Sequence, residues 1–267
     1  METRLKEVIA ILNHKGGVGK TTTTQSLSAA MIRRHKDWRV LVIDLDPQGD
    51  LSKLLGWESD GRTVTDALRE VSGLPVYKNE KGICYVPSSR ELQGIDPSLL
   101  NQMQPLLVLR RCFFQNIDDH TGDGLTTIPE SFDYVLIDTP PALSKCTYNA
   151  MAVASGLLIP VQMEGLSVTG LGTVLVEMAR VQQELNPNLQ LRGLLPVMVD
   201  ARPTIVRSFI DYLKQSYGDN VCKTHIPRSI KVNEAQTQKL DIFQWKQWSP
   251  AANAYDELVK ELFEEQI

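Results

Sequence analysis

Cysteine is scarce in this sequence: there are four, Cys84, Cys112, Cys146 and Cys222, and none belongs to a CxxC pair. Their wide separations fit neither a zinc knuckle nor the closely spaced framework of a small disulfide-rich protein. Reduced thiols are therefore expected, as is usual for a protein of the cytoplasm.

Long apolar runs are also absent. No stretch approaches the roughly 20 apolar residues that a membrane-spanning helix needs, and the charged residues 1–7 lead into a short apolar run unlike a signal peptide. Neither sign of charge dominates, because 28 Lys and Arg stand against 32 Asp and Glu for a net charge of -4. Any contact with nucleic acid must therefore come from a local basic patch. We expect a soluble, cytoplasmic protein with no membrane partner.

What the sequence does contain is an alternation of buried strands and helices. Its 267 residues, 42% of them hydrophobic, suffice for one large α/β domain over residues 1–267. Apolar runs typical of strands buried on both faces occur at residues 8–12, 40–43, 134–137, 156–160 and 193–199. Helical patterns occupy residues 22–34 and 168–185, whereas residues 57–131 are less regular, with a short strand at 83–86 and an exposed acidic loop at 118–124. This alternation predicts an α/β fold: a mostly parallel twisted sheet with helices on both faces and ligands at the carboxyl ends of its strands.

The segment Asn-His-Lys-Gly-Gly-Val-Gly-Lys-Thr-Thr at residues 13–22 predicts a phosphate-binding loop. It follows an apolar strand and opens a helix, which is the setting that such a loop requires. Its glycines let backbone N–H groups curl around phosphates, and the helix adds its positive end. Lys20 is expected to reach the β- and γ-phosphates, and the Thr21 hydroxyl to bind Mg²⁺. The usual pattern is broken only at His14, which replaces the first glycine, and Lys15 adds a second lysine.

Two of the predicted strands end in acidic residues. Asp44, Asp46 and Asp50 follow one buried run, and Asp138 ends the run at residues 134–137. Unpaired carboxylates are costly beside a hydrophobic strand, so a cation or a bound water is expected there. Asp138 fits the acid that holds Mg²⁺ in P-loop enzymes. For each motif taken alone, an aspartate that only caps the next helix remains the alternative.

These motifs together resemble a known family. The lysine-doubled loop KGGVGKTT and the segments VLVIDLDPQGDLS and FDYVLIDTPP are similar to those of the ParA/MinD group of deviant Walker ATPases. The similarity continues at residues 160–162, 198–202 and 226–231, and it is greatest to the ParA/Soj partition ATPases. It therefore covers nearly the whole chain, and it implies a P-loop NTPase of the deviant Walker A type that hydrolyses ATP with Mg²⁺.

The resemblance also implies roles for individual residues. Lys15 would be the signature lysine that crosses an ATP-sandwiched homodimer and stabilises charge on the phosphoryl group of the other subunit. Asp46 would orient the attacking water, while Asp44 and Asp138 would support the magnesium shell. Residues 47–52 and 139–144 would form the two switches. The implied nucleotide-binding residues are Lys15, Gly16, Gly17, Val18, Gly19, Lys20, Thr21, Thr22, Met198, Pro227 and Arg228.

The same resemblance implies macromolecular partners. ParA-like ATP dimers bind DNA without sequence preference, so the chain would segregate a plasmid, chromosome or mobile element on the nucleoid. A ParB-like centromere-binding or adaptor protein would stimulate its hydrolysis. The loop at 118–124 is longer than expected for the family, and the segment after residue 231 lacks an expected proline; both changes bear on the partner-binding surface. The candidates for contacts with DNA phosphates are Arg202, Arg207, Arg228 and Lys231, although scattered basic residues are more often merely solvated.

A MinD-like or other cargo-positioning ATPase that acts on a membrane or a protein cluster is one alternative, and the membrane form would need a basic amphipathic tail. Here the polar face of the tail is mostly acidic, which an anionic membrane would repel. We expect instead that this tail packs on the sheet. The residues that recur in it at helical spacing are Tyr255, Leu258, Val259, Leu262 and Phe263.

Two further alternatives are weaker. A redox ATPase like the nitrogenase iron protein would need two cysteines per subunit at a dimer axis, and only Cys146 is suitably placed. A non-catalytic adaptor on the same fold would lack Lys20 or the acidic residues, and all of them are present.

Overall fold

The computed structural model describes residues 3–58, 60–162, 167–199 and 203–264. These residues form an eight-stranded sheet in the order β5-β3-β4-β2-β6-β1-β7-β8. Six adjacent strands run parallel to one another: β4 (Cys84–Val86), β2 (Val40–Asp44), β6 (Tyr134–Asp138), β1 (Glu7–Ile11), β7 (Gly156–Gln162) and β8 (Gln190–Val197). At one edge β3 (Pro75–Lys78) is antiparallel to β4, and the short β5 (Asp118–Asp119) pairs with β3. The predicted fold class is confirmed.

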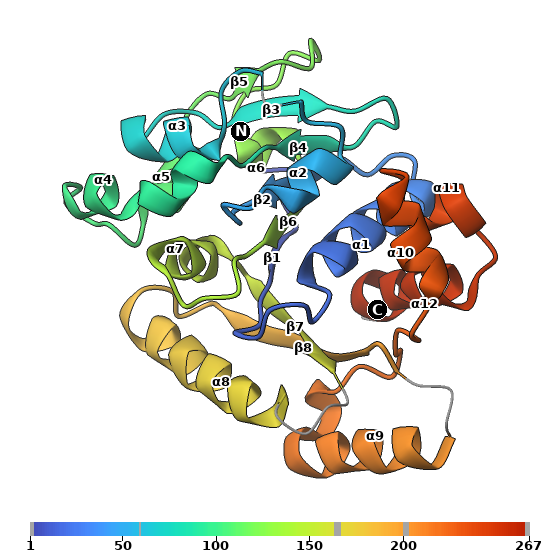
Figure 1. The fold of residues 1–267 in the computed structure, drawn as a ribbon. Helices are drawn as coiled ribbons and strands as arrows, with labels where there is room; N and C mark the ends of the chain where they lie inside the picture. Colours follow the sequence, from blue (N-terminus) through green and yellow to red (C-terminus); the bar gives the residue numbers. More distant parts are fainter. Residues whose placement is uncertain (1–2, 59, 163–166, 200–202, 265–267) are drawn as a thin grey trace.

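Helices cover both faces of the sheet. In Figure 1 one face carries α1 (Lys20–Arg34), α10 (Ile230–Thr237), α11 (Ile242–Lys246) and α12 (Pro250–Val259). The other carries α3 (Val64–Glu70), α5 (Val108–Phe113), α7 (Lys145–Val153) and α8 (Ser167–Glu184). The remaining helices are α2 (Asp50–Leu54), α4 (Asp96–Leu100), α6 (Ile128–Ser131) and α9 (Pro203–Tyr217), the last of which lies beyond the β8 edge.

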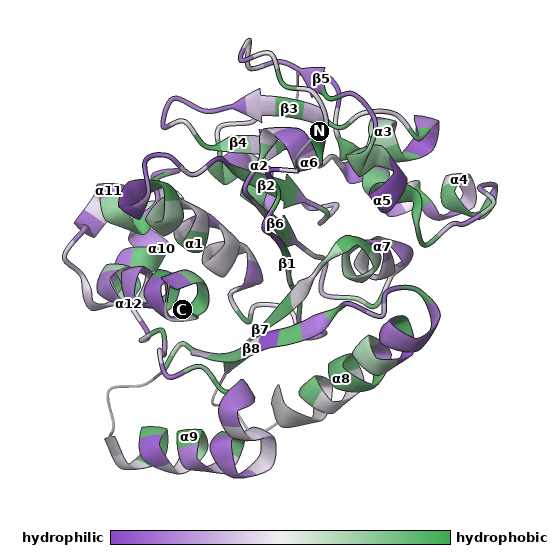
Figure 2. Cartoon of the chain, turned by 180° about the vertical axis from the view of Figure 1, so that it is seen from behind, coloured by the Kyte–Doolittle hydropathy of each residue, from purple (hydrophilic) through white to green (hydrophobic). Residues whose placement is uncertain are grey.

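The two faces of the sheet bury separate cores because side chains alternate along each strand. From β1, Val8 and Ala10 pack into the core under α7 and α8, whereas Ile9 and Ile11 pack into the core under α1 and α12. Figure 2 shows the central strands coloured as apolar along their length. Burial on both faces is why the sequence of these strands reads as continuous apolar runs rather than as alternation.

The region 57–131 holds more structure than the sequence indicated. Its α3 begins at a capping box, in which Thr63 and Asp66 bond each other's backbone N–H groups. The expected strand at 83–86 is confirmed as β4. The acidic loop 118–124 starts with β5, and Asp119 organises it by accepting hydrogen bonds from the N–H groups of Thr121, Gly124 and Leu125.

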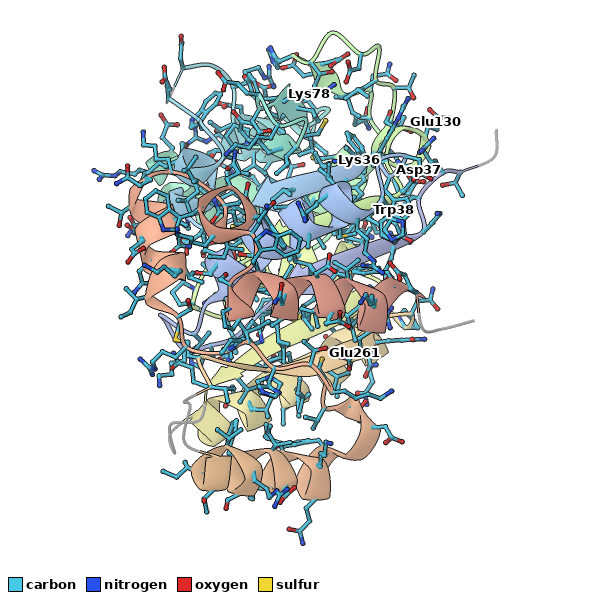
Figure 3. All side chains as sticks on the ribbon, turned by 90° about the vertical axis from the view of Figure 1, so that its right-hand side faces the viewer. Lys36, Asp37, Trp38, Lys78, Glu130 and Glu261 are labelled. Carbon is cyan, nitrogen blue, oxygen red and sulfur yellow. The ribbon has the colours of Figure 1, made fainter. Side chains whose placement is uncertain are left out.

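The C-terminal tail packs on the fold, as predicted. The tail has an apolar stripe that joins the core beneath α1 and is at most 3% exposed. This stripe consists of Tyr255, Leu258, Val259 and Leu262. Glu261, labelled in Figure 3, fixes the segment further by accepting the backbone N–H groups of Lys223 and Thr224 at 2.6 and 2.8 Å. The described residues include no helix long and apolar enough to cross a bilayer.

Candidate nucleotide site

Hydrogen bonds with β7 and within the loop hold the segment between β1 and α1 in shape. The buried Asn13 accepts the N–H of Lys15 at 3.0 Å and donates to the carbonyl of Pro160, at 2.7 Å, in β7. Gln162 donates to the carbonyl of Gly17 at 3.2 Å. Gly17 and Gly19 have φ of 74° and 80°, a conformation that L side chains rarely adopt. The loop therefore presents its backbone N–H groups at the N-terminus of α1, as an anion site requires.

Two lysines lie at this loop, and their Nζ atoms contact different protein groups. Lys20 is buried and its Nζ donates to the carbonyl of Lys15 at 3.3 Å. Burial lowers the pKa of Lys20, while the charges of Asp138 and Asp46 act in the opposite direction. Lys15 is half-buried, and its Nζ lies 3.4 Å from Gln162 Oε1 of its own chain.

Thr21 and Asp138 meet at the carboxyl ends of the strands. The Thr21 hydroxyl donates to Asp138 Oδ2 at 2.7 Å, and Asp138 is fully buried at the end of β6. Among the described residues, Asp138 Oδ1 has no hydrogen-bond partner. Burial, and then the nearby Asp44, raise the pKa of Asp138 well above its ordinary value. A buried carboxylate with an orphaned oxygen beside a hydroxyl fits a hard cation such as Mg²⁺.

Asp44 and Asp46 differ in how they are held. Asp44 Oδ1 accepts the N–H of Asp46 at 3.0 Å, and its Oδ2 accepts the N–H and the hydroxyl of Ser52 at 2.9 and 2.6 Å. Burial raises the pKa of Asp44 to about 6 against the lowering effect of these donors. Asp46 is only half-buried and accepts the N–H of Gln48 at 2.9 Å. Asp46 is thus the acid that remains open to a water, and a magnesium role for Asp44 stays a prediction.

No group of three or more His, Cys, Asp or Glu side chains that could hold a metal occurs in the part of the chain that the structure describes. Mg²⁺ is usually held by one or two protein oxygens together with waters and phosphates. Thr21 and Asp138 would supply those protein oxygens.

A cavity of about 130 Å³ adjoins the N-terminus of α1. Two segments form its wall: the N–H of Val199 donates to the carbonyl of Ile226 at 3.0 Å, and the N–H of Arg228 donates to the carbonyl of Val199 at 2.9 Å. Its lining residues include Gly19, Thr22, Met198, Pro227 and Arg228. Met198, Pro227 and Arg228, three of the predicted nucleotide-binding residues, are therefore brought together beside the phosphate loop. Their contact with the adenine base stays a prediction.

The four candidates for DNA contacts are not on one element. Arg202 lies outside the described residues. Arg207 is exposed on α9, whereas Lys231 is exposed at the start of α10, on the face covered by α1. Lys231 Nζ is paired with both carboxylate oxygens of Glu234, at 3.0 and 2.9 Å. Arg228 lines the cavity beside the phosphate loop. Their role in DNA binding stays a prediction.

The cysteines bear on the iron–sulfur alternative. Cys84, Cys112, Cys146 and Cys222 are all buried. Burial raises the pKa of the Cys146 thiol to about 12, so without a metal this cysteine is a neutral thiol at neutral pH.

Comparisons with known proteins agree with this site. A family described as an AAA domain matches residues 6–191, a stretch that holds the phosphate loop, Asp44, Asp46 and Asp138. Sporulation initiation inhibitor protein Soj of Bacillus subtilis is 33% identical over 261 residues, which cover 96% of this chain and 98% of that protein. The chain belongs to the ParA/Soj family of P-loop ATPases.

Two further proteins extend the comparison for this ParA/Soj family member. Chromosome-partitioning ATPase Soj of Thermus thermophilus is 35% identical over 254 residues, or 95% of this chain and 94% of that protein. The crystal structure of cobyrinic acid a,c-diamide synthase from Mycobacterium smegmatis, with bound ADP and magnesium, has a TM-score of 0.78 and 31% identity. It covers 96% of this chain and 95% of its own.

The sequence did not predict a specific role for several residues of the site. Ser52 and Ser88 connect to Asp44, and Gln236 of α10 donates to the Thr22 hydroxyl at 3.0 Å. Ser52 falls within the predicted first switch, which is the one signal that could have singled it out. Gln236 lies 214 residues from its partner, so no local pattern marks it.

Proposed function

We propose that this chain is an ATP-hydrolysing ParA-like partition protein, a single ATPase domain over residues 1–267 that uses ATP and Mg²⁺. The observation that carries the proposal is Asp138, a fully buried carboxylate that bonds Thr21 and whose other oxygen has no partner among the described residues. Such a carboxylate is costly without a cation. The names of the Soj relatives support the partition role.

The residues suggest how hydrolysis would proceed. The loop N–H groups and Lys20 bind the phosphates, and Thr21 with Asp138 holds the magnesium site. Mg²⁺, when bound, neutralises charge on the phosphoryl oxygens. Asp46 orients the water that attacks the γ-phosphate, because it is the site carboxylate that is open to a water. Lys15 reaches across to a second subunit, which makes the complete site a property of the homodimer.

DNA and protein partners complete the proposal. The ATP dimer binds DNA without sequence preference through Arg207, Arg228 and Lys231, with Arg202 as a fourth candidate. A ParB-like protein stimulates turnover, and the protein works in the cytoplasm on the nucleoid. The membrane-positioning alternative is less favoured, because the apolar stripe of the tail is already buried in the core beneath α1.

A second activity needs a separate test, because one similar structure is named as an amide-forming synthase. In that type of reaction ATP would serve to activate a carboxylate acceptor. The decisive assay measures phosphate release from Mg²⁺-ATP by the purified protein alone and with plasmid DNA, with no acceptor added. Turnover that depends on Asp46, together with salt-sensitive DNA binding in ATP, supports the partition proposal. Turnover that begins only when a carboxylate acceptor is added would refute it.

A further inference from the structure

The first switch is tied to the loop after β4 by a buried relay of hydrogen bonds. Ser52 donates its hydroxyl proton to Asp44 Oδ2 at 2.6 Å, and the same oxygen of Ser52 accepts the N–H of Ser88 at 2.9 Å. Asp44 Oδ1 accepts the N–H of Asp46 at 3.0 Å. Asp44, Ser52 and Ser88 are 1%, 1% and 3% exposed, so water does not compete for these groups.

The end of the relay at Ser88 is held in place by contacts between α3 and the loop after β4. The N–H of Val64, the first residue of α3, donates to the carbonyl of Pro87 at 2.8 Å. The hydroxyls of Thr65 and Ser89 lie 3.2 Å apart. The loop after β4 is thus fixed on α3, and Ser88 gives the switch a rigid point of attachment.

The other end of the relay, at Ser52 in α2, depends on the attachment to Ser88. Ser52 sits in α2, a helix of five residues that follows Gly49 in a left-handed conformation with φ 62°. A helix this short is not stable without tertiary contacts. Leu51 packs in a small core with Val42 on one side of the helix, and Ser52 supplies the polar attachment to β2 and to the loop after β4.

We propose that Ser52 is a positioning residue for ATP hydrolysis, which fixes the Asp44–Asp46 segment so that Asp46 meets the attacking water. This inference rests on the proposed ATPase function. Ser52 lines neither the cavity beside α1 nor the phosphate loop, so it acts on the position of Asp46 and not on nucleotide binding. Loss of its hydroxyl would leave the buried N–H of Ser88 unpaired and remove one of the three donors to Asp44.

The test compares Ser52→Ala with Ser52→Thr and with a matched control, Ser131→Ala. Ser131 is buried like Ser52, at 3% exposed against 1%, and its hydroxyl accepts a backbone N–H, from Thr126 at 3.0 Å, but it lies in α6 away from the relay. Steady-state hydrolysis gives kcat and KM, and binding of a fluorescent ATP analogue gives the nucleotide Kd. Ser52→Ala should lower kcat by about 10- to 100-fold, because small misplacements of catalytic groups have effects of this size. KM and Kd should stay within about twofold, a split typical of lost transition-state stabilisation.

Ser52→Thr keeps both the donor and the acceptor and should restore most of kcat, while Ser131→Ala should match the wild type. Amide hydrogen exchange adds a measurement that needs no activity: in the wild type the Ser88 N–H should exchange slowly, and in Ser52→Ala both it and the N–H of Asp46 should exchange faster. Equal kcat for Ser52→Ala and wild type, or a Kd that weakens in step with kcat, would overturn the positioning role. A wild type that hydrolyses no ATP even with DNA and a partner would instead overturn the proposed function itself.

Discussion

The hydroxyl of Thr21 lies 2.7 Å from Oδ2 of Asp138 and joins the first turn of α1 to the end of β6. The bond leaves the other carboxylate oxygen of Asp138 without a partner among the described residues. Burial and the nearby Asp44 raise the pKa of Asp138, and the Thr21 hydroxyl and the charge of Lys20 offset this only in part. The buried charge is therefore costly, and we expect a bound magnesium ion to reduce that cost. On this account, function and stability conflict at this position.

Asp138→Asn should consequently stabilise the nucleotide-free protein while it removes the magnesium-dependent activity. The asparagine carbonyl can still accept the Thr21 hydroxyl, and the cost of burying a charge disappears. Thermal unfolding at neutral pH without nucleotide should show a melting temperature a few degrees above wild type. Addition of Mg²⁺-ATP should then raise the wild-type value by more than that of the variant. A variant that melts below wild type in the absence of nucleotide would contradict this account.

The same acid predicts a pH dependence. The pKa of Asp138 is raised in the folded state, so this group binds its proton more tightly when folded than when unfolded. Its effect on stability is therefore unfavourable at high pH: the free energy of unfolding falls as pH rises above the ordinary value of 3.8 toward the folded pKa. Asp44 adds to this loss between 3.8 and about 6. Denaturant titrations across this range should show a smaller decline in Asp138→Asn than in wild type.

Two lysine variants should separate ATP binding from dimer assembly: Lys20→Ala and Lys15→Gln. Lys20→Ala removes the charge that compensates the β- and γ-phosphates, so binding of ATP should be lost. Lys15→Gln should leave monomeric binding largely intact and weaken the dimer, because the proposed partner of Lys15 is the phosphate of the other subunit. Light scattering with a non-hydrolysable ATP analogue measures the mass. A wild type that stays monomeric under that analogue would rule out the sandwich dimer.

The pairing of Lys231 with Glu234 gives a specific prediction for DNA. Glu234→Gln removes the charge that competes with phosphates for Lys231, and the amide oxygen can still accept from Trp245, whose indole N–H lies 2.9 Å from Glu234. DNA binding by the ATP dimer should therefore strengthen a few-fold. Lys231→Glu should weaken it and reduce the salt dependence of binding. ATP-driven dimerisation serves as the control and should not change in either variant.

The C-terminal helix offers a test of the core. Leu258 is fully buried beneath α1, so Leu258→Ala should lower the free energy of unfolding by about 2–5 kcal/mol. A tail that worked as a membrane anchor would instead lose vesicle binding with little loss of stability. Chemical denaturation and flotation with anionic vesicles distinguish these outcomes.

The sequence predicted those parts of the molecule that leave a local pattern. The strands buried on both faces appear as apolar runs, and the phosphate loop appears as glycines and lysines between a strand and a helix. Contacts between distant residues could not be predicted. Ser52 and Ser88 are 36 residues apart, and Thr22 and Gln236 are 214 apart, so only the folded chain brings them together. The antiparallel β3 and the short β5 were missed because strands of four and two residues are too brief to show a period.

The most direct test of the central claim is single-turnover hydrolysis by wild type and Asp46→Ala, with nucleotide affinity measured in parallel. Wild type should release phosphate from bound Mg²⁺-ATP, and DNA with a partner protein should accelerate that release. Asp46→Ala should bind ATP with near wild-type affinity and lose most of the hydrolysis, because the water is no longer oriented. Hydrolysis by Asp46→Ala at the wild-type rate would contradict the assignment of the water-orienting acid and the reaction proposed for this site.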